Sequence, residues 1–354
     1  MLRFSLLCTC LFLIAFSDLA AQDKHFTQYY SAPMTINPAL TGAYQGKYRI
    51  SIIKRDQWRQ ALDSPYSTFA GAVDVRFNTS YKQRKYDDAV GVGILFFNDK
   101  VDDIGFRTTQ MALSAAYHKA LDQHGTHYLS LGTQMSTNQR SVNYENLTFQ
   151  DQYDGQNGYA LPTGEALPEN NFSYTDLSVG LNYTFAPTNR TSFFIGAAMH
   201  HVFEPNVSFL AANPDLQVVI PQEDNLHRKY SGQISARFPI AEKVHLTPRV
   251  LFSSQGPHLE TNAGSNIRFA MGDYNPFALY LGSWARVVKN ADQSLGLDAI
   301  VAMIGIEYQS VLVGFSYDLN VDDLALPAHR RTSFEISIAY LGNFENEELL
   351  CPKF

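Results

Sequence analysis

The chain has 354 residues, 45% of them hydrophobic and 13% aromatic, with a formal net charge of -7 and a pI near 5.8. It carries no basic stripe or charge block, which argues against nucleic acid as a partner. Beyond the N-terminus, the longest clean apolar run, 299–306, is far below the roughly 20 residues that a membrane-spanning helix needs. We therefore expect no transmembrane helix, whereas the many Tyr and Phe residues are compatible with the aromatic girdles of a membrane β-barrel.

The N-terminus is typical of a secretory signal peptide. One positive charge, Arg3, precedes an apolar run over 4–16, and the small pair Ala20-Ala21 follows it. We expect residues 1–21 to be removed, so that the mature chain begins at Gln22.

Cysteine usage excludes an internal disulfide in that mature chain. Cys8 and Cys10 lie inside the apolar run rather than after it, which disfavours a lipoprotein anchor, and cleavage would remove both. Only Cys351 then remains, either incidental or paired with a periplasmic partner.

An aromatic leader with two prolines, residues 22–45, comes next. Pro33 and Pro38 exclude it from the interior of a sheet. Asn37 as N-cap, Pro38 at the first helical position and Gly42 at the end predict one helical turn. The alternative is a flexible leader that happens to be aromatic.

From about Tyr48 onward, apolar residues recur at every second position, which is the period of a strand with one apolar and one polar face. The alternation is clearest in 69–77, 176–185, 311–319 and 331–340, where charges occupy only the second face. We predict strands at 46–56, 67–78, 89–99, 107–121, 126–138, 173–186, 191–204, 228–238, 243–255, 260–272, 277–288, 297–308, 311–320 and 330–341. This makes about fourteen strands, an even number, as bacterial outer-membrane barrels require.

The connections alternate between long and short, as in an outer-membrane barrel with long extracellular loops and tight periplasmic turns. The two longest, 139–172 and 205–227, fall on the same side, and 122–125 and 309–310 on the other side are tight. A soluble all-β fold has no reason for this asymmetry and is the disfavoured alternative. We predict an all-β, antiparallel, up-and-down transmembrane barrel over 46–341, in the cell outer membrane, with a periplasmic tail at 342–354.

A barrel of this width has a lumen that must be filled or else conducts. Because the leader precedes the first strand, we expect it on the periplasmic side, where it is a candidate for closing the lower mouth. The loop 139–172 is the candidate for closing the upper mouth.

A search for catalytic and metal-binding patterns finds none that is complete. The sequence has no Gly-x-Ser-x-Gly elbow and keeps no CxxC pair after cleavage. His200 and His201 lie on one predicted strand, where neighbours point to opposite faces, so they are not expected to chelate one metal. The pair His124 and His127 spans a predicted turn.

Two acidic stretches resemble fragments of calcium loops. These are 151–155 and the group of Asp99, Asp102 and Asp103, and neither has the alternating ligand order of the twelve-residue calcium loop. Solvated loops are the simpler interpretation. We predict no enzyme activity, no metal and no cofactor.

The leader QDKHFTQYYSAPMTINPALTGAY (22–44) and KRDQW (54–58) resemble the N-terminal signature of the PorP/SprF family of type IX secretion membrane proteins of the Bacteroidota. The loop stretch LTFQDQYDGQNGY (147–159) and the ending LCPKF (350–354) also resemble the family pattern. Between these stretches, the strand periodicity and the total length agree with the family.

This resemblance implies an outer-membrane barrel that is accessory to type IX secretion and, in gliding species, to export or attachment of large adhesins. It implies as partners a secreted protein with a C-terminal sorting domain, periplasmic lipoproteins of the secretion machinery and outer-membrane lipid. No catalytic residues come with the family. We predict partner contacts at the residues that match its signature positions: Tyr29, Tyr30, Asn37, Pro38, Gly42, Arg55, Trp58, Asp151, Gln152 and Tyr153.

Two other functions remain open. A small-solute channel would have a lumen of mixed charge with no single sign to select an ion. Its predicted lining is Asp74, Arg76, Asp176, Arg237, Asn266, Arg268, Asp298, Asp318 and Glu335. A barrel lipid hydrolase would need a triad, which the sequence does not assemble.

Overall fold

The computed structural model of the protein describes most of the predicted mature chain. The described residues are 25–44, 46–59, 65–79, 88–101, 105–145, 147–156, 158–165, 167–188, 190–209, 224–271, 277–290, 293–321 and 332–342. The predicted signal peptide and the tail 343–354, with Cys351, lie outside them.

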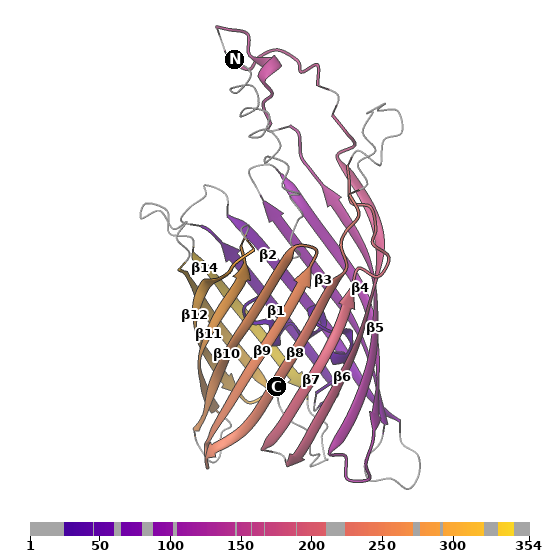
Figure 1. Ribbon diagram of the computed structural model, residues 1–354, viewed down its shortest axis with the longest axis vertical. Coiled ribbons are helices and arrows are strands. Elements are labelled where there is room, and N and C mark those ends of the chain that lie inside the picture. Colours follow the sequence, from indigo (N-terminus) through magenta and orange to yellow (C-terminus); the bar gives the residue numbers. More distant parts are fainter. Residues whose placement is uncertain are drawn as a thin grey trace, which may run out of the picture.

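The described residues form a closed antiparallel barrel of fourteen strands, which confirms the predicted fold (Figure 1). The strands are β1 (Tyr48–Gln57), β2 (Tyr66–Thr79), β3 (Asp88–Val101), β4 (Phe106–Ala120), β5 (His127–Ser141), β6 (Asn171–Thr188), β7 (Thr191–His200), β8 (Lys229–Ala241), β9 (Val244–Gln255), β10 (His258–Met271), β11 (Phe277–Lys289), β12 (Leu295–Tyr308), β13 (Val311–Asn320) and β14 (Thr332–Gly342). Each strand pairs with its neighbours in the sequence, and β1 pairs with β14 to close the barrel.

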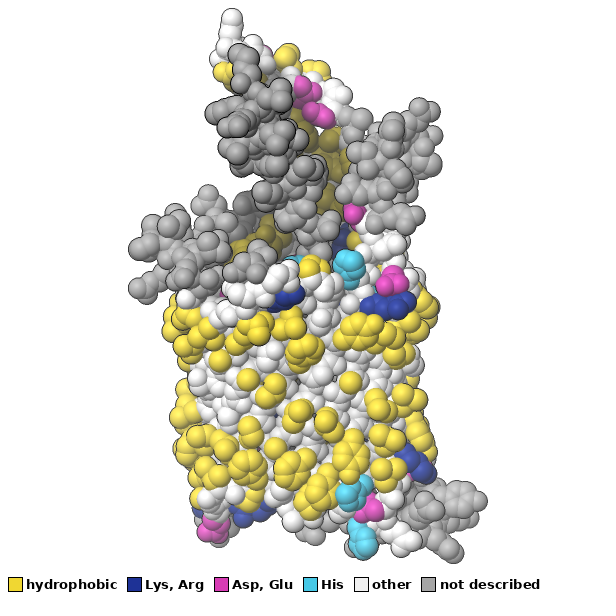
Figure 2. Space-filling model, viewed as in Figure 1, with side chains coloured by type: hydrophobic (Ala, Val, Ile, Leu, Met, Phe, Trp, Pro, Cys, Tyr) yellow, Lys and Arg dark blue, Asp and Glu magenta, His cyan; other side chains and the backbone are white. Residues whose placement is uncertain are grey.

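Successive side chains along each strand alternate between the outer and the inner face of the barrel wall, as the period of two in the sequence predicts. On β4, Met111 and Leu113 are exposed and point outward, while Ala112, Ser114 and His118 are buried and face the lumen. On the face shown in Figure 2, hydrophobic side chains are spread over the barrel wall, and the charged ones lie near its two ends. An apolar outer face and a polar inner face suit a wall that has lipid on one side.

The two ends of the barrel differ as predicted. One end, called here the long-loop end, carries the connections 142–170 and 201–228. At the other end, Gln309 and Ser310 alone join β12 to β13, and a similar two-residue turn joins β8 to β9.

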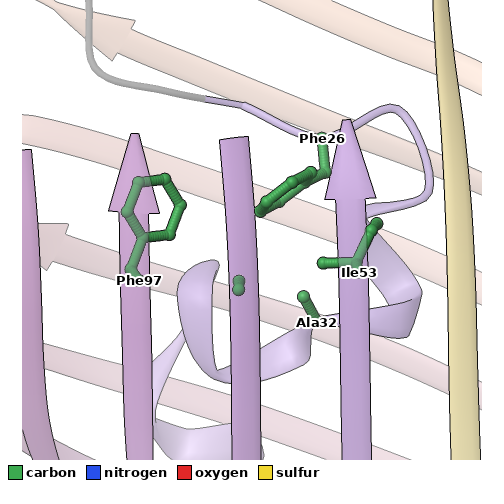
Figure 3. Packing of buried hydrophobic residues seen from close by; sticks show 5 residues of the cluster. Phe26, Ala32, Ile53 and Phe97 are labelled. Atoms are coloured by element: carbon green, nitrogen blue, oxygen red, sulfur yellow. The ribbon is translucent and has the colours of Figure 1, made fainter. Parts of the chain in front are cut away.

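The leader does not lie below the barrel but runs through its lumen. It forms three short 3-10 helices, η1 (Tyr29–Ser31), η2 (Pro33–Thr35) and η3 (Pro38–Leu40). Near the start of the described leader, Phe26 and Ala32 pack against Ile53 of β1 and Phe97 of β3 (Figure 3).

The path of this segment differs from the expected position at the lower mouth. His25 Nδ1 lies 3.2 Å from Glu260 Oε2 at the start of β10, which is at the long-loop end. Near the opposite end, the hydroxyl of Tyr44 donates to the carbonyl of Asp74 on β2 at 2.6 Å. The segment 25–44, called here the plug, therefore spans the lumen from one end toward the other.

Candidate functional site

The plug is held near the long-loop end by a buried group of charged side chains, called here the seam cluster: Arg55, Arg286, Asp318 and Glu335. Arg55 Nη1 lies 2.5 Å from Glu335 Oε1 and its Nη2 lies 3.2 Å from Asp318 Oδ2. Arg286 Nη1 pairs with Asp318 Oδ2 at 2.9 Å. Burying a charge without a partner costs several kcal/mol of folding free energy, roughly, so each side chain of the cluster is stable in its place only while its partners are present.

The plug backbone completes the seam cluster. The N–H groups of Thr27 and Gln28 donate to the two carboxylate oxygens of Glu335 at 2.7 and 2.8 Å. The Thr27 hydroxyl donates to Asp318 Oδ2 at 3.0 Å. Strands β1, β13 and β14 thus supply charged groups to which the start of the plug is hydrogen-bonded.

A second charged pair holds the other end of the plug. Arg49 Nε and Nη2 bind the two oxygens of Asp74 at 2.9 and 2.8 Å, a bidentate geometry that favours strong pairing. Asp74 also accepts the N–H of Gly42 at 2.7 Å, and Arg49 donates to the carbonyl of Leu40 at 3.0 Å. The backbone of Gly42 has a φ of +73°, a conformation that glycine adopts without strain.

Between the seam cluster and the Arg49–Asp74 pair, the plug passes close to glycines of the barrel wall. The predicted N-cap is present, since Asn37 Oδ1 accepts the N–H of Ala39 at 2.8 Å. A Cβ added to Gly180 of β6 would overlap the Asn37 side chain, and one added to Gly132 of β5 would overlap the backbone of Pro38 and Ala39. The wall is therefore shaped to the plug at these positions.

Tyr29 and Tyr30 pack inside the barrel against Trp284 of β11. The ring of Tyr30 stacks on Trp284 at 5.7 Å and 21°, and that of Tyr29 meets it edge-on at 5.7 Å. The guanidinium of Arg249 lies 4.4 Å from the centre of the Tyr30 ring. Both tyrosines thus belong to a cluster within the lumen.

Trp58 lies just after β1 and belongs neither to the seam cluster nor to the Arg49–Asp74 pair. Its backbone N–H donates to the carbonyl of Thr332 at 2.8 Å, and its ring meets that of Tyr66 edge-on, with 5.3 Å between the ring centres.

Asp151, Gln152 and Tyr153 lie in the loop 142–170, around the short helix η4 (Gln150–Gln152). In Figure 1 this loop is drawn in magenta and projects beyond the rim of the barrel. Asp151 accepts hydrogen bonds from Thr163 Oγ1 at 3.0 Å and from the N–H of Gly164 at 2.5 Å. The loop is therefore braced by its own side chains.

The tip of this loop exposes apolar side chains. Tyr153 bridges to Tyr159, and their rings lie 5.5 Å apart. Both are 56% exposed, and Leu161 is 48% exposed. We call these three residues the loop-tip patch.

The structure thus divides the ten predicted residues into separate groups. Six lie at the interface between plug and wall, one follows β1, and three lie in the loop 142–170. Of the predicted lumen residues, Asp74, Asp318 and Glu335 are fully buried, and Asp176 and Asn266 nearly so. The sequence reasoning missed Arg49, Arg286 and the wall glycines as plug contacts, although their inward positions on alternating strands were available as a signal.

The two adjacent histidines do not point to opposite faces as predicted. The strand β7 ends at His200, and the backbone of His201 has a φ of +58°, which breaks the alternation. His200 Nε2 lies 2.9 Å from the carbonyl of Ile36, and His201 Nδ1 lies 2.6 Å from Asp176 Oδ2. Within the described part of the chain, no group of three or more His, Cys, Asp or Glu side chains is arranged to hold a metal. None of the helices in the described part is long and apolar enough to cross a membrane.

The model of the family "Type IX secretion system membrane protein PorP/SprF" matches residues 18–340. The chain belongs to this family. The match covers the plug and nearly all of the barrel, and the family together with the fourteen-strand barrel places the protein in the cell outer membrane. A search of curated proteins found no match.

Several solved outer-membrane proteins resemble the barrel. The deltaS2 mutant of TodX, a monoaromatic hydrocarbon channel, is 11% identical over 89% of this chain and 94% of its own, with a TM-score of 0.48. CymD, another monoaromatic hydrocarbon channel, is 13% identical over 89% and 93%, also at 0.48. A Pseudomonas aeruginosa FadL homologue is 10% identical over 86% and 92%, again at 0.48. At these identities and TM-scores the likeness is no guide to function.

Proposed function

We propose that this PorP/SprF protein is a non-enzymatic barrel that holds a secreted cell-surface protein, an adhesin with a C-terminal sorting domain, and links it to periplasmic lipoproteins of the type IX machinery. The observation that carries the proposal is the braced loop 142–170, which presents the loop-tip patch beyond the rim of the barrel. Exposed aromatic and apolar side chains on a rigid support are typical of protein-binding surfaces.

In this proposal the predicted contact residues have two kinds of role. Asp151 and Gln152 brace the loop, and Tyr153 contacts the partner directly. Tyr29, Asn37, Pro38, Gly42 and Arg55 are buried, and Tyr30 is partly buried inside the barrel. These six residues contact a partner only if the plug leaves the lumen, and otherwise they hold the plug in place. Trp58 lies at the same end of the barrel as the loop and is retained as a contact.

The test is affinity purification of the tagged full chain from outer membranes in mild detergent, followed by mass spectrometry. We expect a large secreted protein and envelope lipoproteins to co-purify with the unaltered chain. Replacing Tyr153, Tyr159 and Leu161 together with Ala should abolish recovery of the secreted protein and leave the lipoproteins bound. Glu165→Ala, an exposed change on the same loop, is the matched control. Undiminished recovery with the triple variant would contradict the proposal.

The tyrosines of the plug allow a further test of their role. Replacing Tyr29 and Tyr30 with Ala should weaken partner capture while the barrel still assembles. Loss of the folded barrel would instead assign these two residues to structure.

The alternative function, a small-solute channel, is disfavoured by the plug. The plug contacts β1 and β14 through η1 and β4, β5 and β6 through η3, so it crosses the path of a solute. A planar bilayer holding the purified protein should show no steady conductance, and deletion of 25–42 should open one. Steady conductance of the unaltered protein would favour the channel.

A further inference from the structure

A cavity at the long-loop end of the lumen is lined by both polar and apolar side chains, and the proposed function does not use it. It has a volume of about 100 Å³ and lies between Met34 and Thr35 of the plug and the inner faces of β3 to β6. Because about 10–15 Å³ of such volume already holds one water, it has room for several waters or for a small chemical group. We call it the outer cavity.

Two of the amide side chains that line it are almost fully buried, so leaving their polar atoms without hydrogen bonds would cost free energy. Gln134 is 5% exposed and Asn138 is 6% exposed. No hydrogen bond joins the Gln134 side chain to another described residue, while Asn138 donates to Ser136 Oγ at 3.0 Å and leaves its oxygen uncommitted. Buried amides are usually hydrogen-bonded, so water or a group that enters the cavity would supply their partners.

Arg140, near the end of β5, gives the cavity its charge. Within the described part of the chain it has no carboxylate partner. Its Nη1 lies 3.4 Å from the carbonyl of Val207, and its buried Nε has no hydrogen-bond partner among the residues that the structure describes. Most of the five guanidinium donors therefore remain available.

The carboxylate among the lining residues, Asp176, forms no ion pair with Arg140 and instead has other hydrogen-bond partners. Asp176 binds His201 Nδ1 at 2.6 Å and the N–H of Leu177 at 2.8 Å. The ring of Tyr174, 5.9 Å from the Arg140 guanidinium, completes this side of the cavity. The cavity is thus lined by a guanidinium that has no carboxylate ion-pair partner among the described residues and by the side-chain amides of Gln110, Gln134 and Asn138.

We propose that the outer cavity binds a carboxylate-bearing polypeptide segment that enters from the long-loop end, with Arg140 paired to the carboxylate. Guanidinium groups bind carboxylates through short, charge-assisted hydrogen bonds. The amides of Gln110, Gln134 and Asn138 match the donors and acceptors of peptide groups. This inference rests on the proposed function, because it supplies that function with a second contact site, separate from the loop-tip patch.

The test uses Arg140→Lys and a carbodiimide, which condenses an amine with a carboxylate that lies in salt-bridge contact. Outer membranes that carry the full chain with this change are treated, and cross-linked tryptic peptides are identified. We expect position 140 to be joined to an Asp, a Glu or the C-terminal carboxylate of a second polypeptide. Arg140→Gln should give no product and should lower recovery of the secreted protein about tenfold, the effect of one charge-assisted pair.

Arg107→Gln, an exposed change at the same rim, should leave recovery unaltered and serves as the matched control. The heat-dependent shift on electrophoresis verifies that each variant is a folded barrel. A cross-link from position 140 to Asp176 of the same chain would overturn the inference, as would retention of a phosphorylated lipid in place of a polypeptide. So would full recovery of the secreted protein with Arg140→Gln.

The inference and the proposed function can fail separately. If recovery of the secreted protein depends on the loop-tip patch but not on Arg140, the outer cavity is not a binding site and the proposed function is still supported. A cross-link at position 140 to a polypeptide that is not secreted would support the outer cavity as a binding site but contradict the proposed identity of the partner.

Discussion

Arg55 on the first strand and Glu335 on the last form an ion pair across the junction that closes the barrel, with 2.5 Å between Nη1 and Oε1. Both residues are almost completely buried. The same carboxylate accepts the backbone N–H groups of Thr27 and Gln28. Closure of the barrel and attachment of the plug therefore depend on the same pair.

Removing the positive member of this pair should be strongly destabilising. Arg55→Gln leaves Glu335 and Asp318 buried with less compensation, and losing one partner of a buried pair typically costs about 3–5 kcal/mol. Urea unfolding in detergent micelles should show a loss of this size. Lys54→Gln, next in sequence and 54% exposed, should change little, because Asp56 keeps its closer partner Arg59 at 2.8 Å. Equal stability of the two variants would exclude the structural role of the pair.

The close approach of plug and wall predicts a difference between glycines. Gly132→Ala introduces a methyl group against the backbone of Pro38 and Ala39, so it should destabilise the protein by about 1–3 kcal/mol. Gly232→Ala on β8 is the control, because no atom lies within 4 Å of its added Cβ. The same urea titration measures both, and an unaltered midpoint for Gly132→Ala would mean that the plug lies elsewhere.

The direction of the plug predicts where the start of the described chain is accessible. His25 lies at the long-loop end, and the long loops of outer-membrane barrels are extracellular. In a Cys351→Ser background, His25→Cys should react with a membrane-impermeant maleimide on intact cells. His124→Cys, in the turn between β4 and β5, should react only after the outer membrane is permeabilised. The reverse pattern would contradict the direction described here.

The strands were predictable because their signal is local. A period of two and turn formers at the ends of the runs determine β1 to β14 to within about four residues. The helical turn at Asn37 and Pro38 was predictable for the same reason, since an N-cap and a proline act on their immediate neighbours.

The path of the plug was not predictable, because its contacts have no local signature. Thr27 meets Glu335 across 308 positions of the chain, and the alternation of β14 indicates that Glu335 faces inward but not what it binds. Likewise, β7 ends where His201 adopts a left-handed backbone, a conformation that is uncommon for any residue other than glycine and that the period of two does not indicate. Side-chain pairing across the lumen requires the closed barrel itself.

The position of the plug inside the lumen can be measured by a disulfide. Thr41 of the plug and Ser114 of β4 are buried, with 2.6 Å between their hydroxyl oxygens. With Cys351 replaced by Ser, Thr41→Cys combined with Ser114→Cys should form an intramolecular disulfide in cells, detected by thiol alkylation and mass spectrometry. Thr41→Cys combined with Ser333→Cys, near the long-loop end, should remain reduced. A folded barrel in which the first pair also remains reduced would contradict a plug held within the lumen.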